Sequence, residues 1–501
     1  MLLVSTALTD LKQRLAEVYD LQRTLGVLRW DQQTMMPPQG AAARAEAAAT
    51  LTGIVHERFV SEETGRLLEQ VAPLELEYDS DDASLIRVTR KEWEKERRVP
   101  TQLRADWARE AGNAHIAWLE AREANDFSVF LPAFQRVHEV ALRWAEYMEQ
   151  GDSPYDPFLD EYEPGMKTAE VKAVFDVLRP EFTAIVREAG EAGEPADASF
   201  LQGDFAIATQ QEFLAGVMHD FGFEEGTYRL DPTVHPFAIW FSGGDIRMTT
   251  RYRPDNLQAL WSTMHEAGHG LSFRGIDPLL RRSPLDGLPS MALAESQSRT
   301  WENLVGRSLP FWRGRYPELQ RRFPQLQNVG LEAWYRGINN VDPGLIRVDA
   351  DEVTYSLHII LRFELEQELV AGTLDPAGLP EAWNARMHEL LGVEVPDDVR
   401  GVLQDVHWTR AGYGYFPTYA LGNVLSVQIW RAVAQDLPEV EAQLEAGEFG
   451  PLYDALRERL YRHGAKFTPM ETLDRAIGAD AIDPQPYLEY LREKIGGLKV
   501  V

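Results

Sequence analysis

The stretch PDNLQALWSTMHEAGHGL, residues 254–271, carries the strongest structural signal in the chain. From Leu257 to Leu271 its apolar residues recur at three- and four-residue spacing, which is the pattern of a helix with one buried face. The Pro-Asp-Asn that opens the stretch is typical of a helix start. We therefore predict a helix here, with its apolar face on the core.

The same helix contains HEAGH, residues 265–269, which is an HExxH pattern. Histidines four positions apart lie on one helical face, so the imidazoles of His265 and His269 can bind one cation. Glu266 is offset by about 100° and is placed to act as a base on metal-activated water. A chance match on a surface helix is the competing interpretation, and composition predicts one in about one chain in forty. A metal site is therefore favoured.

A third ligand is needed, because a catalytic zinc has three protein ligands and an open position. The candidates lie in a second predicted helix that follows Ser290, a typical N-cap residue. Glu295 is the first candidate, since 26 residues separate it from His269, enough for one loop and a returning helix. Glu302, on the same face of that helix, is the weaker one.

Helical periodicity also dominates the rest of the chain. It is clearest in residues 8–28, 105–123, 131–150, 170–190 and 353–371. The one β signal is residues 235–252, where two apolar runs flank the turn residues 242–245. There is no long linker or repeat. We therefore expect one domain, residues 1–501, that is mainly α-helical, with a small β-hairpin beside the HExxH helix.

Composition narrows the class of protein. The 50 Lys and Arg against 79 Asp and Glu give a formal net charge of −29, which argues against binding to nucleic acid or to an anionic membrane. The chain has no cysteine, so any metal must be bound by His, Asp or Glu. No stretch approaches the roughly 20 apolar residues of a membrane span, and the first residues lack the basic region of a signal peptide. A cytoplasmic protein is expected.

Several motifs follow one another in a set order. They are WDQQTMMP (30–37), HPF (235–237), DIRMT (245–249), HEAGH (265–269), AESQ (294–297), IRVDAD (346–351) and GVLQDVHW (401–408). In this order they resemble the carboxypeptidase Taq family of thermostable metallocarboxypeptidases, and they span most of the chain. One departure is Ala294, where the family usually has His before the ligand Glu. Glu295 itself is retained.

The resemblance implies a neurolysin-like helical fold with two lobes around a deep groove. It also implies a homodimer, a cytoplasmic location, and zinc or cobalt as the activating metal. The expected activity is removal of C-terminal residues, with broad specificity, from peptides with a free C-terminus. Zinc held by His265, His269 and Glu295 would activate the water, and Glu266 would move its proton.

A carboxypeptidase has to recognise a terminal carboxylate, for which the planar fork of an arginine is suited. Arg347 in the IRVDAD motif is the first choice for this role and Arg247 in the hairpin is the second. His235 of the HPF motif is a further candidate for substrate binding. For each arginine, an ion pair with one of the many acids is the alternative interpretation.

Peptide hydrolysis also needs hydrogen-bond donors for the oxyanion. His407, which we expect at the end of a helix, is one candidate. Tyr415 and Tyr419, which follow it closely, are alternatives for the second donor, although either could instead be a core or rim residue. Two rivals remain: an endo-acting oligopeptidase with the same metal site, and a catalytically silent helical scaffold. The retained Glu266 counts against the scaffold.

Overall fold

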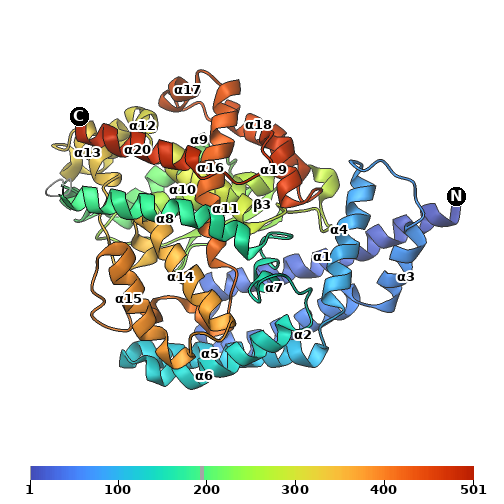
Figure 1. Ribbon diagram of the computed structural model, residues 1–501. Helices are drawn as coiled ribbons and strands as arrows, with labels where there is room; N and C mark the ends of the chain where they lie inside the picture. Colours follow the sequence, from blue (N-terminus) through green and yellow to red (C-terminus); the bar gives the residue numbers. More distant parts are fainter. Residues whose placement is uncertain (1, 192–196, 501) are drawn as a thin grey trace.

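The computed structural model describes residues 2–191 and 197–500, and helices make up most of it (Figure 1). The predicted mainly α-helical class is confirmed. The N-terminal helices are α1 (Leu2–Thr34), α2 (Ala41–Phe59), α3 (Glu62–Val71) and α4 (Asp81–Glu96). Serine caps set two of their starts, because the side chains of Ser61 and Ser80 accept hydrogen bonds from the first-turn amides of α3 and α4.

These four helices form a lobe with a second apolar cluster, to which Ile276, Leu280 and Leu285 from the loop after α10 also belong. Leu67, Leu68 and Val71 of α3 pack there with Leu11 and Leu15 of α1. In Figure 1 the lobe projects on the right, where the N-terminus lies. Its core is separate from the larger core that holds the other helices together.

The second, larger lobe contains the remaining helices. They are α5 (Thr101–Ala124), α6 (Phe127–Ala145), α7 (Asp156–Leu159), α8 (Thr168–Glu191), α9 (Ile207–Asp220), α10 (Gln258–Gly275), α11 (Met291–Arg299), α12 (Leu309–Arg322), α13 (Leu331–Ile338), α14 (Thr354–Val370), α15 (Leu379–Leu391), α16 (Phe416–Asp436), α17 (Val440–Ala446), α18 (Gly450–Arg459), α19 (Pro469–Ile477) and α20 (Gln485–Val500). Between α1, α2 and α4 on one side and the loops before α11 and α19 on the other lies a cavity of about 590 Å³. Neither His265, His269 nor Glu295 lines this cavity, so the predicted deep groove at the active site stays a prediction.

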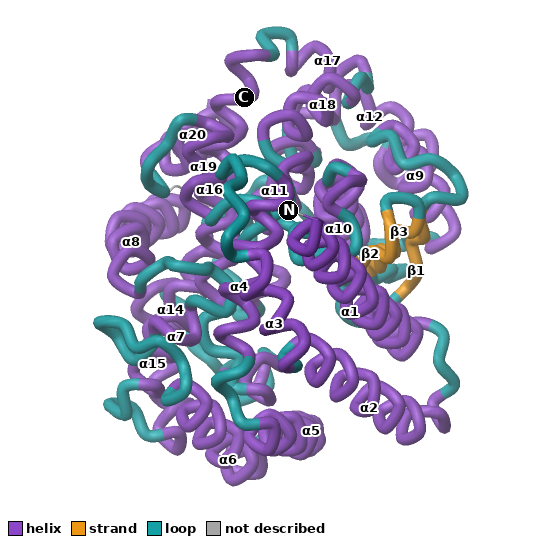
Figure 2. Tube along the Cα trace, turned by 90° about the vertical axis from the view of Figure 1, so that its right-hand side faces the viewer, coloured by secondary structure: helices purple, strands orange, loops and turns teal. Residues whose placement is uncertain are grey.

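A small sheet lies beside α10 (Figure 2). It contains β1 (Tyr228–Pro232), β2 (Ala238–Ser242) and β3 (Asp245–Thr250) in the order β1-β3-β2. The hairpin β2–β3 was predicted from the sequence. Strand β1, which pairs with β3 in parallel, was not. Ile246 and Met248 of β3 are fully buried, so the sheet is fixed to the large core through this central strand.

Two predicted boundaries differ from the structure. Helix α6 ends at Ala145 and not near Gln150, because the backbone tightens there: the amides of Tyr147 and Met148 donate to the carbonyls three residues earlier. His407 does not end an α-helix. It lies in a short 3₁₀ turn, Val406–Arg410, between extended Asp405 and left-handed Ala411. Along residues 2–191 and 197–500, no helix is long and apolar enough to cross a membrane.

Candidate metal centre

Helix α10 presents His265 and His269 to the interior of the large lobe. The apolar stripe predicted for this helix is buried throughout: Leu257, Leu260, Trp261, Met264, Gly268 and Leu271. Glu266, which is offset from the two histidines around the helix, is also buried and only 5% exposed. The helix is therefore enclosed on nearly all sides, and its one acidic side chain lies in a low-dielectric setting.

Helix α11 positions Glu295. Its first turn is capped twice, because Ser290 accepts a hydrogen bond from the Leu293 amide at 3.2 Å and Glu163 accepts one from the Ala292 amide at 2.6 Å. The Ser290 cap was predicted from the sequence. Beyond α11 the chain continues as a π-helical segment, Thr300–Val305, which carries Glu302.

Glu295 and the two histidines converge on one point. Glu295 Oε2 lies 3.5 Å from His265 Nε2 and 3.9 Å from His269 Nε2. One ligand atom from each residue lies within 4.8 Å of the others. Two ligands of a tetrahedral zinc are roughly 3.4 Å apart, given bonds of about 2.0–2.1 Å. The donor set therefore fits a divalent cation, and the structure brings together the three residues that the sequence singled out as ligands.

Glu302 lies behind this group. Its Oε2 contacts His265 Nδ1 at 2.8 Å, on the opposite side of the imidazole from Glu295. The same oxygen accepts a hydrogen bond from Arg299 Nη1 at 2.9 Å, and Arg307 lies 4.0 Å from the other oxygen. Glu302 thus fixes the ring of His265 and directs Nε2 to the metal centre, which is the usual role of a carboxylate outside the ligand set.

The protonation states suit cation binding except at His265, where burial lowers the pKa but Glu302 and the other nearby carboxyl groups raise it by more, so that it lies above its usual value. Burial lowers the pKa of His269 to about 4, so this imidazole is neutral at neutral pH. Burial opposes ionisation of Glu295 and Glu302, but His269 and His265 outweigh it for Glu295, and Arg299 for Glu302. The pKa of Glu295 is lowered, and that of Glu302 falls to about 2. Burial raises the pKa of Glu266 to about 8, so this carboxyl can exchange a proton near neutral pH.

Two glycines let the helices around the site approach closely. A Cβ at Gly268 in the HExxH motif would lie 2.5 Å from the carbonyl oxygen of Gln297 on α11. A Cβ at Gly422 on α16 would lie 2.6 Å from Cβ of Glu295. Helix α11 is thus held between α10 and α16 with no room for a methyl group on either side.

His407, Tyr415 and Tyr419 lie together next to this packing. The ring centroids of Tyr415 and Tyr419 are 5.2 Å apart, and that of His407 lies 5.4 Å from Tyr415 and 6.4 Å from Tyr419. Burial raises the pKa of both tyrosines, and the charge of Glu295 acts in the same direction on each. Burial lowers the pKa of His407 to about 3. The group therefore offers neutral hydrogen-bond donors near the metal centre.

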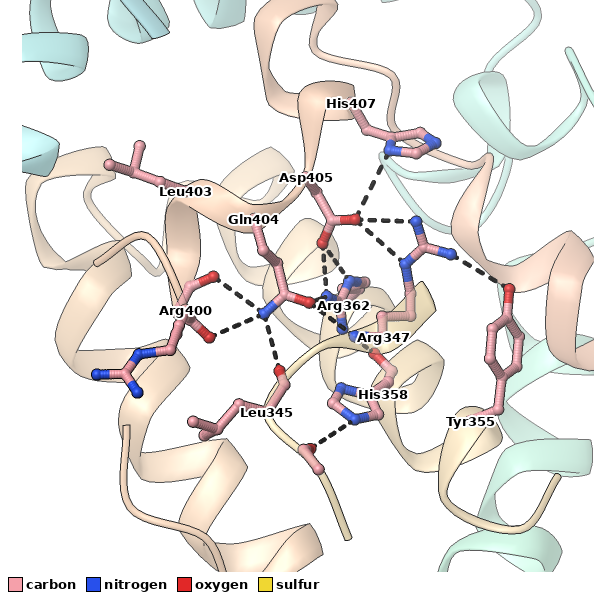
Figure 3. Close-up of polar contacts among 12 residues, drawn as sticks. Leu345, Arg347, Tyr355, His358, Arg362, Arg400, Leu403, Gln404, Asp405 and His407 are labelled. Carbon is pink, nitrogen blue, oxygen red and sulfur yellow. Dashed lines mark hydrogen bonds and ion pairs between the residues drawn. The ribbon is translucent and has the colours of Figure 1, made fainter. Parts of the chain in front are cut away.

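Arg347 is held by an ion pair within the chain (Figure 3). Its Nε and Nη2 donate to Asp405 Oδ1 at 3.1 and 3.0 Å, and its Nη1 donates to the hydroxyl of Tyr355 at 3.2 Å. The other oxygen of Asp405 accepts from Arg362 Nε at 2.6 Å. The guanidinium of Arg347 is buried but keeps one N–H on each terminal nitrogen beyond these bonds.

Arg247 is engaged in the same way. Its Nε and Nη2 donate to the two oxygens of Asp245 at 2.9 and 3.0 Å, and its guanidinium lies 4.5 Å from the ring centre of Trp30. Trp30 is buried, so this pair joins β3 to the end of α1. Both arginines thus form an ion pair within the chain, which was the alternative interpretation of each in the sequence.

His235 lies in a region of positive charge. Burial lowers its pKa, and Arg251, Arg347 and Arg122 lower it further. Arg251 is exposed, and together with Arg253 it partly offsets the burial that raises the pKa of Asp349. It directly follows β3, and the sequence interpretation missed it. Its position two residues after the DxRxT motif was the available signal.

The helical fold and the His-His-Glu donor set define a metallopeptidase of the HExxH class. The profile of the family described as carboxypeptidase Taq (M32) metallopeptidase matches residues 10–495. Thermostable carboxypeptidase 1 of Thermus thermophilus is 38% identical over 488 residues, 95% of this chain and 96% of that protein. Carboxypeptidase 1 of Bacillus subtilis is 32% identical and covers 98% of this chain and 97% of its own length. The chain belongs to the carboxypeptidase Taq (M32) family and is a metallocarboxypeptidase.

Solved structures agree. The M32 carboxypeptidase from Deinococcus radiodurans has a TM-score of 0.95 at 39% identity, with 99% of this chain and 100% of that chain covered. A Pyrococcus furiosus carboxypeptidase has a TM-score of 0.94 at 33% identity, with 97% and 98% covered. The likeness therefore extends over both lobes.

Proposed function

We propose that this metallocarboxypeptidase is zinc-dependent, with cobalt as an alternative metal, and that His265, His269 and Glu295 hold the ion. The observation that carries the proposal is the convergence of these three donors, with Glu302 fixing His265 from behind. A bound ion of this kind supplies Lewis acidity to the scissile carbonyl and lowers the pKa of water. The substrates are peptides with a free C-terminus.

Glu266 acts as the general base in this proposal. It takes a proton from the attacking water and passes it to the leaving amine. A pKa near 8 in the free chain supports the role, because a base that titrates near the working pH can both accept and release a proton. A nearby cation would favour the ionised carboxylate that has to accept the proton first.

His407 and one of Tyr415 and Tyr419 stabilise the oxyanion. These residues are largely buried, and His407 is neutral because burial lowers its pKa. Neutral donors that are fixed in a water-poor site stabilise developing charge effectively, which supports this role. Tyr415 is favoured as the tyrosine, since it lies at the start of α16 with its ring closer to His407.

The terminal carboxylate binds in the positive region around His235. Arg347 uses its remaining N–H groups there, and Arg251 contributes a second, exposed cation. Arg247 is the weaker candidate, because Asp245 already binds its Nε and Nη2. A charge-assisted hydrogen bond of this kind is worth about 1.5–3 kcal/mol, or roughly 10- to 150-fold in kcat/KM.

The proposal extends to properties that the family resemblance implies. These are broad side-chain specificity, one catalytic domain over residues 1–501, a homodimer and a cytoplasmic location. Thermostability is included, because the relatives from Thermus thermophilus and Pyrococcus furiosus are both named thermostable carboxypeptidase 1.

One experiment tests the core of the proposal. A single peptide is digested with its C-terminus free or amidated, with and without chelator, and the products are followed by mass spectrometry. We expect a ladder of C-terminal losses from the free peptide, a roughly 10- to 150-fold slower reaction on the amide, and no reaction after chelation until zinc or cobalt is restored. Internal cleavage of both peptides at equal rates would establish an endo-acting oligopeptidase. Full activity in a verified metal-free preparation would refute the metal centre.

A further inference from the structure

The two proposed oxyanion donors lie on one short segment of irregular backbone. Residues 405–415 contain only the 3₁₀ turn Val406–Arg410 before α16 begins, and Ala411 has a left-handed φ of 46°. His407 lies near the start of this segment and Tyr415 at its end. A segment without regular backbone hydrogen bonds depends on contacts with other parts of the chain to hold its side chains in place.

Helix α14 supplies the first of these contacts. Arg362 of α14 donates to Asp405 Oδ2 at 2.6 Å and to the side-chain oxygen of Gln404 at 2.9 Å (Figure 3). Arg362 is fully buried and Asp405 nearly so. This ion pair fixes the start of the segment, two residues before His407.

The second contact comes from the next turn of the same helix face. Glu366 lies four residues after Arg362, and its Oε2 accepts a hydrogen bond from the amide of Gly414 at 3.1 Å. The same oxygen accepts one from the hydroxyl of Tyr155. The Gly414 amide also donates to that hydroxyl, at 2.9 Å. Glu366 and Tyr155 together therefore fix the peptide group that directly precedes Tyr415.

This carboxyl has no part in the hydrolysis proposed above. Glu366 lies outside the His-His-Glu donor group and is almost completely buried. Burial raises its pKa to about 8, so it is largely protonated at neutral pH. Glutamine has the same shape as the protonated acid and keeps an acceptor oxygen, so it is a close replacement.

We infer that Glu366, together with Tyr155, is a positioning residue that fixes the Gly414 amide and thereby the phenol of Tyr415 in the active site. Arg362 and Glu366, one turn apart on α14, then hold the two ends of the segment that carries both oxyanion donors. The inference rests on the proposed role of Tyr415 in hydrolysis. Misplacement of a catalytic group by about 1 Å can cost on the order of 100-fold in rate.

The test compares Glu366→Leu, Glu366→Gln and Tyr155→Phe in the metal-loaded full-length enzyme. In Glu366→Leu we expect kcat to fall by roughly 10- to 100-fold, with KM and metal content unchanged. Glu366→Gln should keep kcat close to the original value, because it retains an acceptor for the Gly414 amide. Tyr155→Phe, which leaves Glu366 as the one acceptor, should show a smaller fall in kcat. If Glu366→Leu does not fold, Tyr155→Phe decides, and an unchanged kcat in it overturns the inference.

A control separates positioning from general loss of stability. Glu364 is a partly buried carboxylate on α14, two residues before Glu366, and it pairs with Arg179 Nη1 at 2.8 Å and Arg386 Nε at 2.9 Å. Glu364→Leu should lower the Tm and leave kcat unchanged. If Glu364→Leu lowers kcat as much as Glu366→Leu does, the effect is one of stability and the inference is wrong.

Tyr415→Phe distinguishes failure of the inference from failure of the proposed function. Loss of one oxyanion donor lowers kcat by about 10²- to 10³-fold. In the Tyr415→Phe background, Glu366→Leu should have little further effect, because both changes remove one interaction. If Tyr415→Phe keeps full kcat, the oxyanion assignment fails and the positioning role with it. If Tyr415→Phe is slow but Glu366→Leu is not, only the positioning role is overturned.

Discussion

Two arginine–carboxylate pairs of similar length lie in different parts of the molecule. Arg282 donates to both oxygens of Asp20, at 2.8 and 2.6 Å, and connects the loop after α10 to α1. Arg299 donates to Glu302 at 2.9 Å behind the metal centre. The first pair is about half exposed, at 57% and 46%, whereas the second is 11% and 12% exposed.

The surroundings of the two pairs determine how much each pair contributes to the free energy of unfolding. Water and salt screen an exposed pair, which contributes about 0–1 kcal/mol. A buried pair gains little over an apolar replacement, but removal of one partner leaves an isolated charge and costs about 3–5 kcal/mol. The exposed pair thus adds little to the attachment of α1, whereas the residues behind the metal centre include buried charges that need one another. The four predictions below test this distinction, in order of expected effect.

The largest effect is expected within the metal centre. His269→Ala should abolish metal binding and activity, because the remaining donors are two. Glu266→Gln should keep the metal and lower kcat by about 10²- to 10⁴-fold, since it removes the general base. Metal content by elemental analysis and kcat on a free peptide measure both. Turnover near the original rate in metal-loaded Glu266→Gln would remove this residue from the mechanism.

The second largest effect is expected in Glu302→Gln. His265 Nδ1 then loses a charged acceptor, and Arg299 and Arg307 lose the carboxylate they share. We expect metal affinity to fall by roughly 10- to 100-fold, measured by competition with a chelator of known affinity. Unchanged affinity would show that His265 is oriented by its packing alone.

His358 gives the large lobe a dependence on pH. It is fully buried on α14, and burial lowers its pKa from 6.5 to about 3, with Arg362 adding to the effect. Below pH 6.5 the imidazole of His358 binds a proton in the unfolded chain but not in the folded chain. Stability is therefore lost as the pH falls from 6.5 towards 3, by about 2 kcal/mol at pH 5 from this residue.

The check is urea unfolding near pH 7.5 and near pH 5. In His358→Gln the difference in unfolding free energy between the two conditions should shrink by about 2 kcal/mol. An identical difference in the variant and the original chain would show that other groups cause the acid sensitivity.

The smallest effect is expected at the exposed pair. Asp20→Asn keeps the shape of the side chain and removes its charge, so we expect a loss of less than about 1 kcal/mol and no change in kcat. Differential scanning calorimetry at low and high salt measures this, since screening should remove even that difference. A loss of about 3 kcal/mol or more, the size expected when a buried pair is broken, would erase the distinction between the two regions.

The parts of the site that the sequence predicts are those with local signals. The four-residue spacing of His265 and His269 predicts a shared face, and Ser290 predicts the start of the helix that carries Glu295. The β2–β3 hairpin has a turn signal as well. Strand β1 has none, because its five residues, YRLDP, form a strand only against the parallel edge of β3.

Contacts between residues that are far apart in the sequence could not be predicted from it. Arg347 and Asp405 are 58 residues apart, and the chain offers 79 acids to its arginines, so nothing in the sequence identifies this partner. Tyr155 and Glu366 are separated by 211 residues, and neither belongs to a motif. Glu302 was considered as a weaker candidate for the third ligand, but it contacts Nδ1 of His265 from the π-helical segment, which has no sequence signal.

That π-helical segment, Thr300–Val305, also constrains the length of the chain. Glu295 faces one nitrogen of His265 and Glu302 the other, and the junction between α-helix and π-helix lies between them. Deletion of one residue at this junction would turn everything beyond it by about 100° and move Glu302 away from His265, while Glu295 stayed in place. A change of length is therefore more disruptive at this point than a substitution that keeps the length. A homologue one residue shorter here would need a different acceptor for Nδ1 of the first HExxH histidine.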